Sequence, residues 1–311
     1  MQAVLTLPVA LCLLLTGCAP AVRRDQAPAP AARLKVVTTV APVTLLTRSV
    51  AGDCAEVTPL LPPGSGPHGF QSRPQDLLRL QRARLLVING LGLESFLEPL
   101  LRSAGNPSLT LIDSSQGIRV LAAQSSEWQA QHASGARGPA NPHIWLDPQR
   151  AIQQLQTIRD GLIRADPACA AGYRRRADRL IDQLRQLDAE LAAMLTPLAG
   201  RSFVVLHDFA PYFAERYRLK EIHLLHDPEQ PPAPSDLRRV SEAVRRGRIR
   251  ALLRPPQEAS AAFDGLARDL SVGVEPFSPL EILTAAELDD AGSYARLMRA
   301  NAAAMRRALA P

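Results

Sequence analysis

The stretch 166-DPACAAGYRRRADRLIDQLRQLDAELAAMLTPLAG-200 decides the architecture of this 311-residue chain. Its apolar residues recur every three or four positions, Asp166-Pro167 marks its start, and Pro197 and Gly200 mark its end. The apolar positions are Leu180, Leu184, Leu187, Leu191, Met194 and Leu195. The pattern predicts one helix of about 28 residues, roughly 40 Å long, which is longer than the crossover of one βαβ unit requires.

Short apolar segments alternate with helical patterns on both sides of this helix. Strands are expected at 34–40, 56–61, 85–89 and 109–113 before it, and at 202–206, 221–225, 250–253 and 272–277 after it. Helices are expected at 42–51, 74–84, 148–164, 209–217, 236–246 and 293–309. Such alternation predicts parallel sheets. We therefore expect an α/β fold with an N-terminal lobe at 34–165, a bridging helix at 166–198 and a C-terminal lobe at 199–311.

The composition excludes several classes of protein. A hydrophobic fraction of 46% is too high for a chain that is disordered throughout, and no apolar run after residue 17 reaches the length of a membrane-spanning helix. The formal net charge of +6 comes from arginines scattered among acidic residues, and aromatic residues are only 4%. No basic stripe interleaved with aromatic residues is present, so we expect no binding to nucleic acid.

The N-terminus has the features of an exported protein. Residues 3–16 are almost wholly apolar and lead into Leu15-Thr16-Gly17-Cys18, which is similar to a bacterial lipobox. We expect residues 1–17 to be a lipoprotein signal peptide, Cys18 to carry the lipid, and the Ala/Pro-rich residues 18–33 to form a flexible tether. The expected location is outside the cytoplasm, in the periplasm or on the cell surface, with a lipid anchor in a bacterial membrane.

Two cysteines remain in the predicted folded part. Cys54 and Cys169 belong to no C-x-x-C pair, so no cysteine zinc site or thioredoxin-type motif is expected. In an oxidising compartment the two are able to form a disulfide. They fit two buried thiols equally well, and the sequence leaves both options open.

Three of the six histidines occupy positions that suit a metal site. His68 follows the expected strand 56–61, His207 follows the strand 202–206, and His143 precedes the helix that leads into the second half. Ligands of open α/β sheets bind at the carboxyl ends of strands, and imidazoles favour a borderline metal such as Zn²⁺. Asp147 and Asp208 are the candidate acceptors for the second ring nitrogens. His132 and His223 are expected to have no such role, and His226, which follows the expected strand 221–225, is a weaker candidate to line the cleft.

Four motifs together resemble a known family. They are Pro62-Pro63-Gly64 with Pro67-His68 and Pro74-Gln75-Asp76; Asn89-Gly90-Leu91-Gly92-Leu93-Glu94; Asn141-Pro142-His143-Ile144-Trp145-Leu146-Asp147-Pro148; and His207-Asp208 with Tyr212-Phe213-Ala214. They are similar to the signatures of the zinc/manganese-type (cluster A-I) solute-binding lipoproteins of metal ABC transporters. The resemblance extends in order over roughly residues 34–311.

The resemblance implies a metal site in the cleft between two lobes. It carries His68, His143 and His207 over as ligands, and a histidine at the third position is typical of zinc-type members. The implied cargo is Zn²⁺, with Mn²⁺ and Fe²⁺ ranked below it. The implied function is an extracytoplasmic receptor, monomeric and not an enzyme, that delivers its ion to an ABC permease and its ATPase.

The fourth ligand departs from the family pattern. The family has an Asp-Pro-Leu-Gly segment after the last strand, and this chain has Ser278-Pro279-Leu280-Glu281. A serine hydroxyl is a poor zinc ligand, so Glu275, Glu281, Ser278 or a water molecule are the candidates.

Two alternatives from other functional classes remain. Three histidines with an open water position also suit an exported zinc-dependent hydrolase, although neither H-E-x-x-H nor G-x-S-x-G occurs. The second alternative is a homologue that binds metal weakly and acts as a surface adhesin or scaffold, because Ser278 stands at the expected ligand position.

Overall fold

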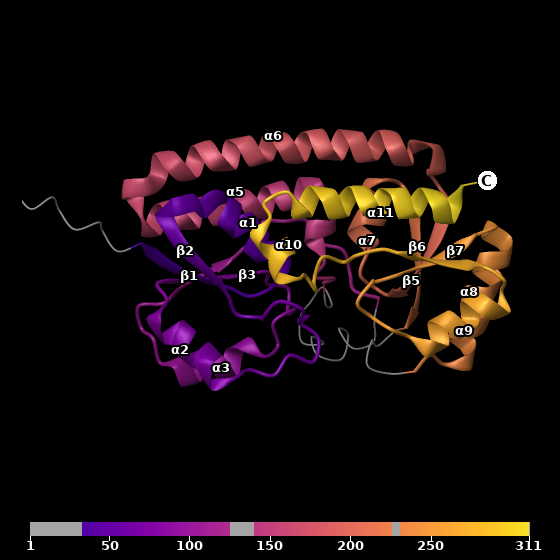
Figure 1. Cartoon of the computed structure of the whole chain (residues 1–311), viewed down its shortest axis with the longest axis horizontal. Helices are drawn as coiled ribbons and strands as arrows, with labels where there is room; N and C mark the ends of the chain where they lie inside the picture. The colour runs from indigo at the N-terminus through magenta and orange to yellow at the C-terminus, as the bar shows by residue number, and fades with distance from the viewer. Residues whose placement is uncertain (1–32, 125–139, 226–230, 311) are drawn as a thin grey trace, which may run out of the picture. The chain divides into compact units, whose positions relative to one another are not determined.

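Two separate four-stranded sheets, each entirely parallel, form the framework of the molecule (Figure 1). The computed structural model describes residues 33–124, 140–225 and 231–310. The predicted signal peptide with Cys18, the tether up to residue 32, His132 and His226 lie outside the described residues. The predicted α/β fold with two parallel-sheet lobes is confirmed, whereas the lobe bounds 34–165 and 199–311 remain predictions.

The first sheet has the strand order β2-β1-β3-β4. Its strands are β1 Leu34–Thr38, β2 Ala55–Pro59, β3 Leu85–Ile88 and β4 Thr110–Asp113. Its helices are α1 Ala41–Ala51, α2 Pro74–Arg82, α3 Leu97–Ala104 and α5 Pro148–Ala165. The central β3 strand is a continuous apolar run, as expected for a parallel strand that is covered on both faces.

The second sheet, with the order β6-β5-β7-β8, repeats this connectivity. Its strands are β5 Ser202–His207, β6 Lys220–Leu225, β7 Ala251–Arg254 and β8 Gly273–Pro276. The helices of this half are α7 Pro211–Arg216, α8 Pro234–Gly247, α9 Ala261–Asp269 and α11 Ser293–Leu309, whereas α10 Ala285–Asp289 follows the second sheet in sequence but lies against α1 of the first half. No strong internal sequence repeat accompanies the shared strand order, so the two halves share topology and not sequence.

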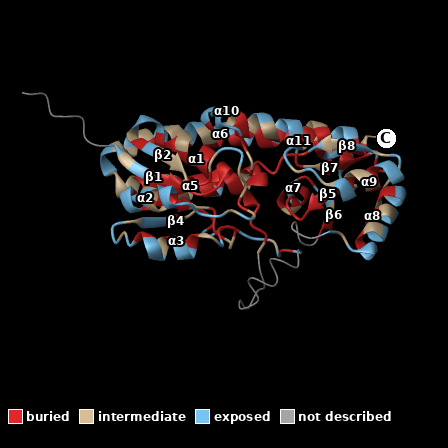
Figure 2. Cartoon of the chain, turned by 60° about the horizontal axis from the view of Figure 1, so that its bottom comes forward, coloured by how far each residue is buried: buried red, intermediate tan, exposed pale blue. Residues whose placement is uncertain are grey.

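One long helix, α6 Ala170–Leu195, bridges the two halves and confirms the prediction of a single long bridging helix, although it is shorter than the predicted 166–198. Single 3-10 turns, Pro167–Cys169 and Thr196–Leu198, precede and follow it. The helix packs on α1 and α5 of the first half and on α11 of the second (Figure 1). Its buried stripe is Tyr173, Ala177, Ile181, Leu184, Leu187, Leu191 and Leu195, and Figure 2 shows buried residues on the inner sides of these helices.

After β8 the chain returns to the first half of the molecule. In this crossing segment, residues 277–290, the carbonyl oxygen of Pro279 accepts a 2.7 Å hydrogen bond from the Trp145 indole N–H. The carbonyl of Leu283 accepts a bond from the Gly64 N–H at 2.8 Å, and that of Leu288 accepts one from Arg48 at 2.9 Å. The segment therefore places residues from the C-terminal part of the chain against the N-terminal lobe.

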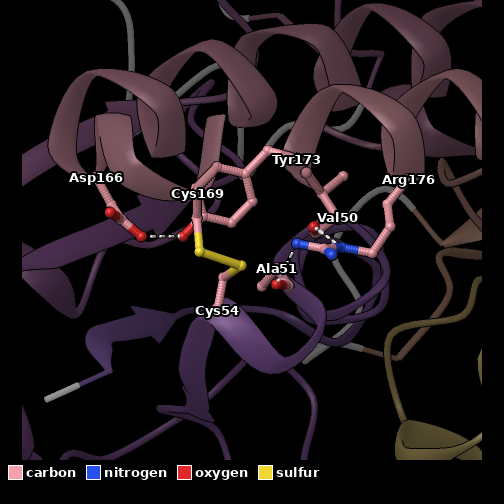
Figure 3. The surroundings of a disulfide bond; sticks show 7 residues. All are labelled: Val50, Ala51, Cys54, Asp166, Cys169, Tyr173 and Arg176. Atoms are coloured by element: carbon pink, nitrogen blue, oxygen red, sulfur yellow. Dashed lines mark hydrogen bonds between the residues drawn. A yellow bond between two sulfur atoms is a disulfide. The ribbon is translucent and has the colours of Figure 1, made fainter. Parts of the chain in front are cut away.

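Cys54 and Cys169 form a disulfide, which settles the question that the sequence left open (Figure 3). The bond joins the turn after α1 to the residue before α6, across a sequence separation of 115 residues. Beside it, the Arg176 guanidinium donates hydrogen bonds to the carbonyl oxygens of Val50 and Ala51 at 2.7 and 2.8 Å. The start of the bridging helix is thus fixed to the first half covalently and by hydrogen bonds.

Candidate metal centre

Four side chains, His68, His143, His207 and Glu281, converge between the two sheets, and each offers one ligand atom within 4.8 Å of the others. The centroids of the three imidazole rings lie 5.8 to 6.4 Å apart. Glu281 Oε1 lies 3.0 Å from His143 Nε2 and 3.7 Å from His68 Nε2. The structure therefore brings together all three histidines predicted as ligands and one of the candidate fourth ligands.

Different elements deliver the four residues. His207 is the last residue of β5, so its side chain lies at the carboxyl end of the second sheet. His68 lies in the loop between β2 and α2, where Pro62, Pro63 and Pro67 restrict the backbone. His143 precedes a buried 3-10 turn, Ile144–Leu146, and Glu281 lies on the crossing segment.

The cluster contains buried polar atoms whose hydrogen-bonding capacity is not used. His143, Glu281 and His207 are 0%, 1% and 3% exposed. Among the described residues, His143 Nε2, Glu281 Oε1 and both ring nitrogens of His207 make no hydrogen bond. His143 Nε2 and Glu281 Oε1 lie 3.0 Å from each other and have no further hydrogen-bond partner among the described residues. Each such atom costs about 1–3 kcal/mol of desolvation, and a cation bound among them would offset this cost.

The pKa values of two members suit a metal site. Burial, together with His68 and His143, lowers the pKa of His207 to about 3. Burial alone would raise the pKa of Glu281, but the neighbouring His143 and His68 hold it well below its usual range. At neutral pH the site therefore holds a neutral imidazole and an ionised carboxylate, which are the protonation states that metal ligation requires.

Asn141 accepts the hydrogen bond from the second nitrogen of His143, a role for which we had expected an aspartate. His143 Nδ1 lies 3.0 Å from Asn141 Oδ1. The Asp147 carboxylate instead accepts from the Gln149 N–H at the start of α5 and from Arg150, and that of Asp208 accepts from the Gln124 N–H. Asp147 and Asp208 therefore have roles in capping and loop attachment.

The other candidate fourth ligands lie outside the cluster of described residues. The Glu275 carboxylate accepts hydrogen bonds from Arg307, and the Ser278 hydroxyl accepts one from the Leu280 N–H. Glu258, which no sequence motif indicated, also lies beside the cluster, with its Oε2 3.7 Å from His207 Nδ1. Burial and the charge of Glu281 raise the pKa of Glu258 to about 7. In the sequence, only the position of Glu258 four residues after β7 pointed to a place near the carboxyl end of the second sheet.

A cavity of about 530 Å³ leads to the cluster. His68, His207, Glu281 and Glu258 line it, together with residues at the start of α9. His223 is not part of this site: it is buried in β6, and its ligand atom lies within 4.8 Å of those of Asp208 and Glu221.

The sequence is similar to those of proteins that are named for metal binding. The iron-binding protein YfeA of Yersinia pestis is 31% identical over 222 residues, which cover 70% of this chain and 68% of that protein. The zinc-binding lipoprotein AdcA of Streptococcus pneumoniae is 28% identical over 278 residues, or 88% of this chain and 55% of that protein. The chain thus spans about half the length of the streptococcal relatives it matches.

The fold is also similar to that of a solved zinc-uptake protein. A crystal structure of ZnuA superposes with a TM-score of 0.79 at 28% identity, covering 90% of this chain and all of that one. The family model described as zinc-uptake complex component A, periplasmic, matches residues 36–308. On the strength of this match over nearly the whole described chain, the protein belongs to the family of periplasmic A components of zinc-uptake complexes.

Proposed function

We propose that this protein is an extracytoplasmic receptor that captures Zn²⁺ as cargo and delivers it to an ABC importer. The observation that carries the proposal is the convergence of His68, His143, His207 and Glu281 with unused, buried ligand atoms. Three imidazole nitrogens and one carboxylate oxygen match the ligand types and the coordination number that zinc prefers. In this proposal Glu281 takes the fourth position, ahead of Glu275, Ser278 and water.

Zinc ranks above manganese and iron on ligand chemistry. Mn²⁺ favours sites richer in oxygen, whereas imidazole suits zinc and also iron. One relative carries the name iron-binding protein, so Fe²⁺ and Mn²⁺ are the competitors against which zinc has to be measured.

In this proposal the four ligand residues bind the ion and catalyse no reaction. His68 has the most accessible side chain of the four, at 20% exposed, and lines the cavity, so we propose that it meets the ion first. The buried His143, His207 and Glu281 then replace the water ligands of the ion. An ABC permease and its ATPase are the proposed recipients, and release requires a movement that changes the ligand geometry.

The proposed location rests on two features. A disulfide persists in oxidising compartments outside the cytoplasm, and Cys54 and Cys169 form one. A relative is named as a lipoprotein, which supports lipidation at Cys18. No helix within the described ranges is both long and apolar enough to span a bilayer. We propose a lipid-anchored monomer that does not bind nucleic acid.

The hydrolase alternative is disfavoured by Glu281. Catalytic zinc sites hold the metal with three protein ligands and keep one position for water, whereas four protein ligands are typical of closed sites. We therefore propose that the protein is not an enzyme. The weak-metal adhesin or scaffold alternative makes a different prediction, namely that no ion binds stoichiometrically.

Calorimetric titration of the metal-free protein with Zn²⁺, Mn²⁺ and Fe²⁺ tests the proposal. We expect one zinc ion per chain, bound more tightly than either competitor. His143→Ala should abolish this binding, while Glu275→Gln should leave it unchanged. A wild-type protein without stoichiometric binding would contradict the receptor, and zinc-dependent cleavage of an ester or peptide would favour the hydrolase.

A further inference from the structure

The Asn141 side chain contacts both halves of the molecule. It is fully buried, and its Oδ1 accepts the His143 backbone N–H at 3.0 Å and lies 3.0 Å from His143 Nδ1. Its Nδ2 donates to the carbonyl oxygen of Asp208 at 2.8 Å. Asp208 directly follows His207, so one amide joins the ring of one candidate ligand to the backbone beside another.

We propose that Asn141 is a positioning residue that couples the orientation of the His143 imidazole to the C-terminal half. The proposal rests on the metal-binding function and extends it to a residue that contacts no ion. The His143 imidazole keeps the orientation that metal binding requires only while the hydrogen bond between Asn141 and Asp208 is intact.

The chemistry of the amide sets the orientation of the ring. Asn141 Oδ1 is an acceptor only, so the imidazole that faces it carries its proton on Nδ1. Nε2 is then the ring nitrogen left to bind metal, and it lies 3.0 Å from Glu281 Oε1. The reverse amide orientation would place an NH₂ group against the His143 N–H and an oxygen against the Asp208 carbonyl, so the surrounding groups permit only one assignment.

A second bond across the two halves holds the Asn141 backbone. The Tyr212 hydroxyl, on α7, donates to the Asn141 carbonyl at 2.7 Å and accepts the Leu121 N–H at 3.0 Å. This bond contacts the main chain only, whereas the amide bond passes through the group that orients His143. The two links are therefore separable by substitution.

Three variants distinguish the contributions. Asn141→Ala removes both side-chain links, and Asn141→Asp keeps the acceptor for His143 but places a carboxylate oxygen against the Asp208 carbonyl. Tyr212→Phe removes the hydroxyl's two bonds to the main chain of the first half, at Asn141 and Leu121, without changing the Asn141 side chain. Circular dichroism and thermal unfolding of the metal-free proteins establish that each variant is folded.

Three measurements provide the test. Competition with a zinc chelator gives the affinity, stopped-flow transfer to excess chelator gives the dissociation rate, and the visible spectrum of bound Co²⁺ reports the ligand geometry. We expect Asn141→Ala to weaken zinc binding roughly 10- to 100-fold, the range for loss of an outer-sphere partner, and to change the Co²⁺ spectrum. Asn141→Asp should keep the spectrum but release zinc faster, and Tyr212→Phe should lose less affinity than Asn141→Ala.

Nitrogen-15 NMR of the metal-free protein adds a readout that does not depend on loading. In the wild type and Asn141→Asp, the His143 Nδ1–H should give the signal of a hydrogen-bonded N–H, and Asn141→Ala should lose that signal. A folded Asn141→Ala variant with wild-type affinity and spectrum would overturn the coupling, as would an Asn141→Asp variant that releases zinc at the wild-type rate. A wild-type protein that binds no metal would refute the proposed function itself, so the two failures are distinguishable.

Discussion

Removal of the Cys54–Cys169 disulfide should destabilise the protein without affecting the metal site. We consider the paired substitution Cys54→Ser with Cys169→Ser, which leaves no free thiol at either position. In the chain-entropy model, closing a loop of 115 residues removes unfolded-state entropy worth about 4.8 kcal/mol at 25 °C. Arg176 still holds the start of α6 to Val50 and Ala51, so the folded variant retains its local contacts and the loss arises mainly in the unfolded state.

Urea unfolding of the metal-free wild type and variant, followed by circular dichroism, measures the difference. We expect the free energy of unfolding to fall by about 2–5 kcal/mol, while zinc affinity changes little because neither cysteine belongs to the ligand cluster. Reduced wild-type protein should behave as the variant does. A loss below about 1 kcal/mol would refute the entropic reasoning, and a large loss of zinc affinity would show that the disulfide also positions the ligands.

Three further substitutions test the site and its support. Glu281→Gln should weaken zinc binding in a chelator competition, because the one carboxylate among the four candidate ligands is lost. Glu275→Gln alters a carboxylate that is paired with Arg307 and should leave zinc binding unchanged. Equal effects of the two substitutions would exclude Glu281 as the fourth ligand. Burial raises the pKa of Glu94 to about 7 despite hydrogen bonds from Thr39, Asn89 and Gly90, so the folded state binds this proton more tightly than the unfolded state. Its contribution to stability is therefore complete below about pH 4.5 and falls by roughly 3 kcal/mol as the pH rises to about 7. Glu94→Gln should remove this part of the pH dependence in urea unfolding at pH 5 and pH 8, and an unchanged pH dependence would contradict the assignment. Gly90 has φ +86°, and a Cβ there would lie 2.2 Å from Asp113 Oδ1. Gly90→Ala should therefore destabilise the fold by about 1–3 kcal/mol, measured as a lower melting temperature. An unchanged melting temperature would mean that the loop relaxes without cost.

Long, regular patterns allowed most of the fold to be predicted from the sequence. The apolar run of β3 was predicted to within one residue, and α6 begins four residues after and ends three residues before the predicted bounds 166–198. Both were found because burial dominates in both. Helices of fewer than three turns carry little periodicity, so α2 and α7 were predicted but α3, α9 and α10 were not. Even so, Thr284 and Glu287 form a capping box at the start of α10, which was a readable signal.

Local sequence predicted the three histidines but not their surroundings. The choice of Glu281 over Ser278 and Glu275 depends on the path of the crossing segment, which the bonds to distant Trp145 and Gly64 determine. Asp147 was expected to support a histidine because it is nearby and acidic, yet the start of α5 uses its carboxylate as a cap. Proximity in sequence alone did not distinguish between these roles.

The crossing segment also determines how the site divides when the molecule opens. Glu281 follows β8 in sequence, but its segment is hydrogen-bonded to the first half through Pro279, Leu283 and Leu288. A motion that separates the two sheets would therefore remove His207 and leave His68, His143 and Glu281 together. Such a motion would divide the candidate ligands three to one, and an ion bound by all four would stay with the N-terminal half with one coordination position open.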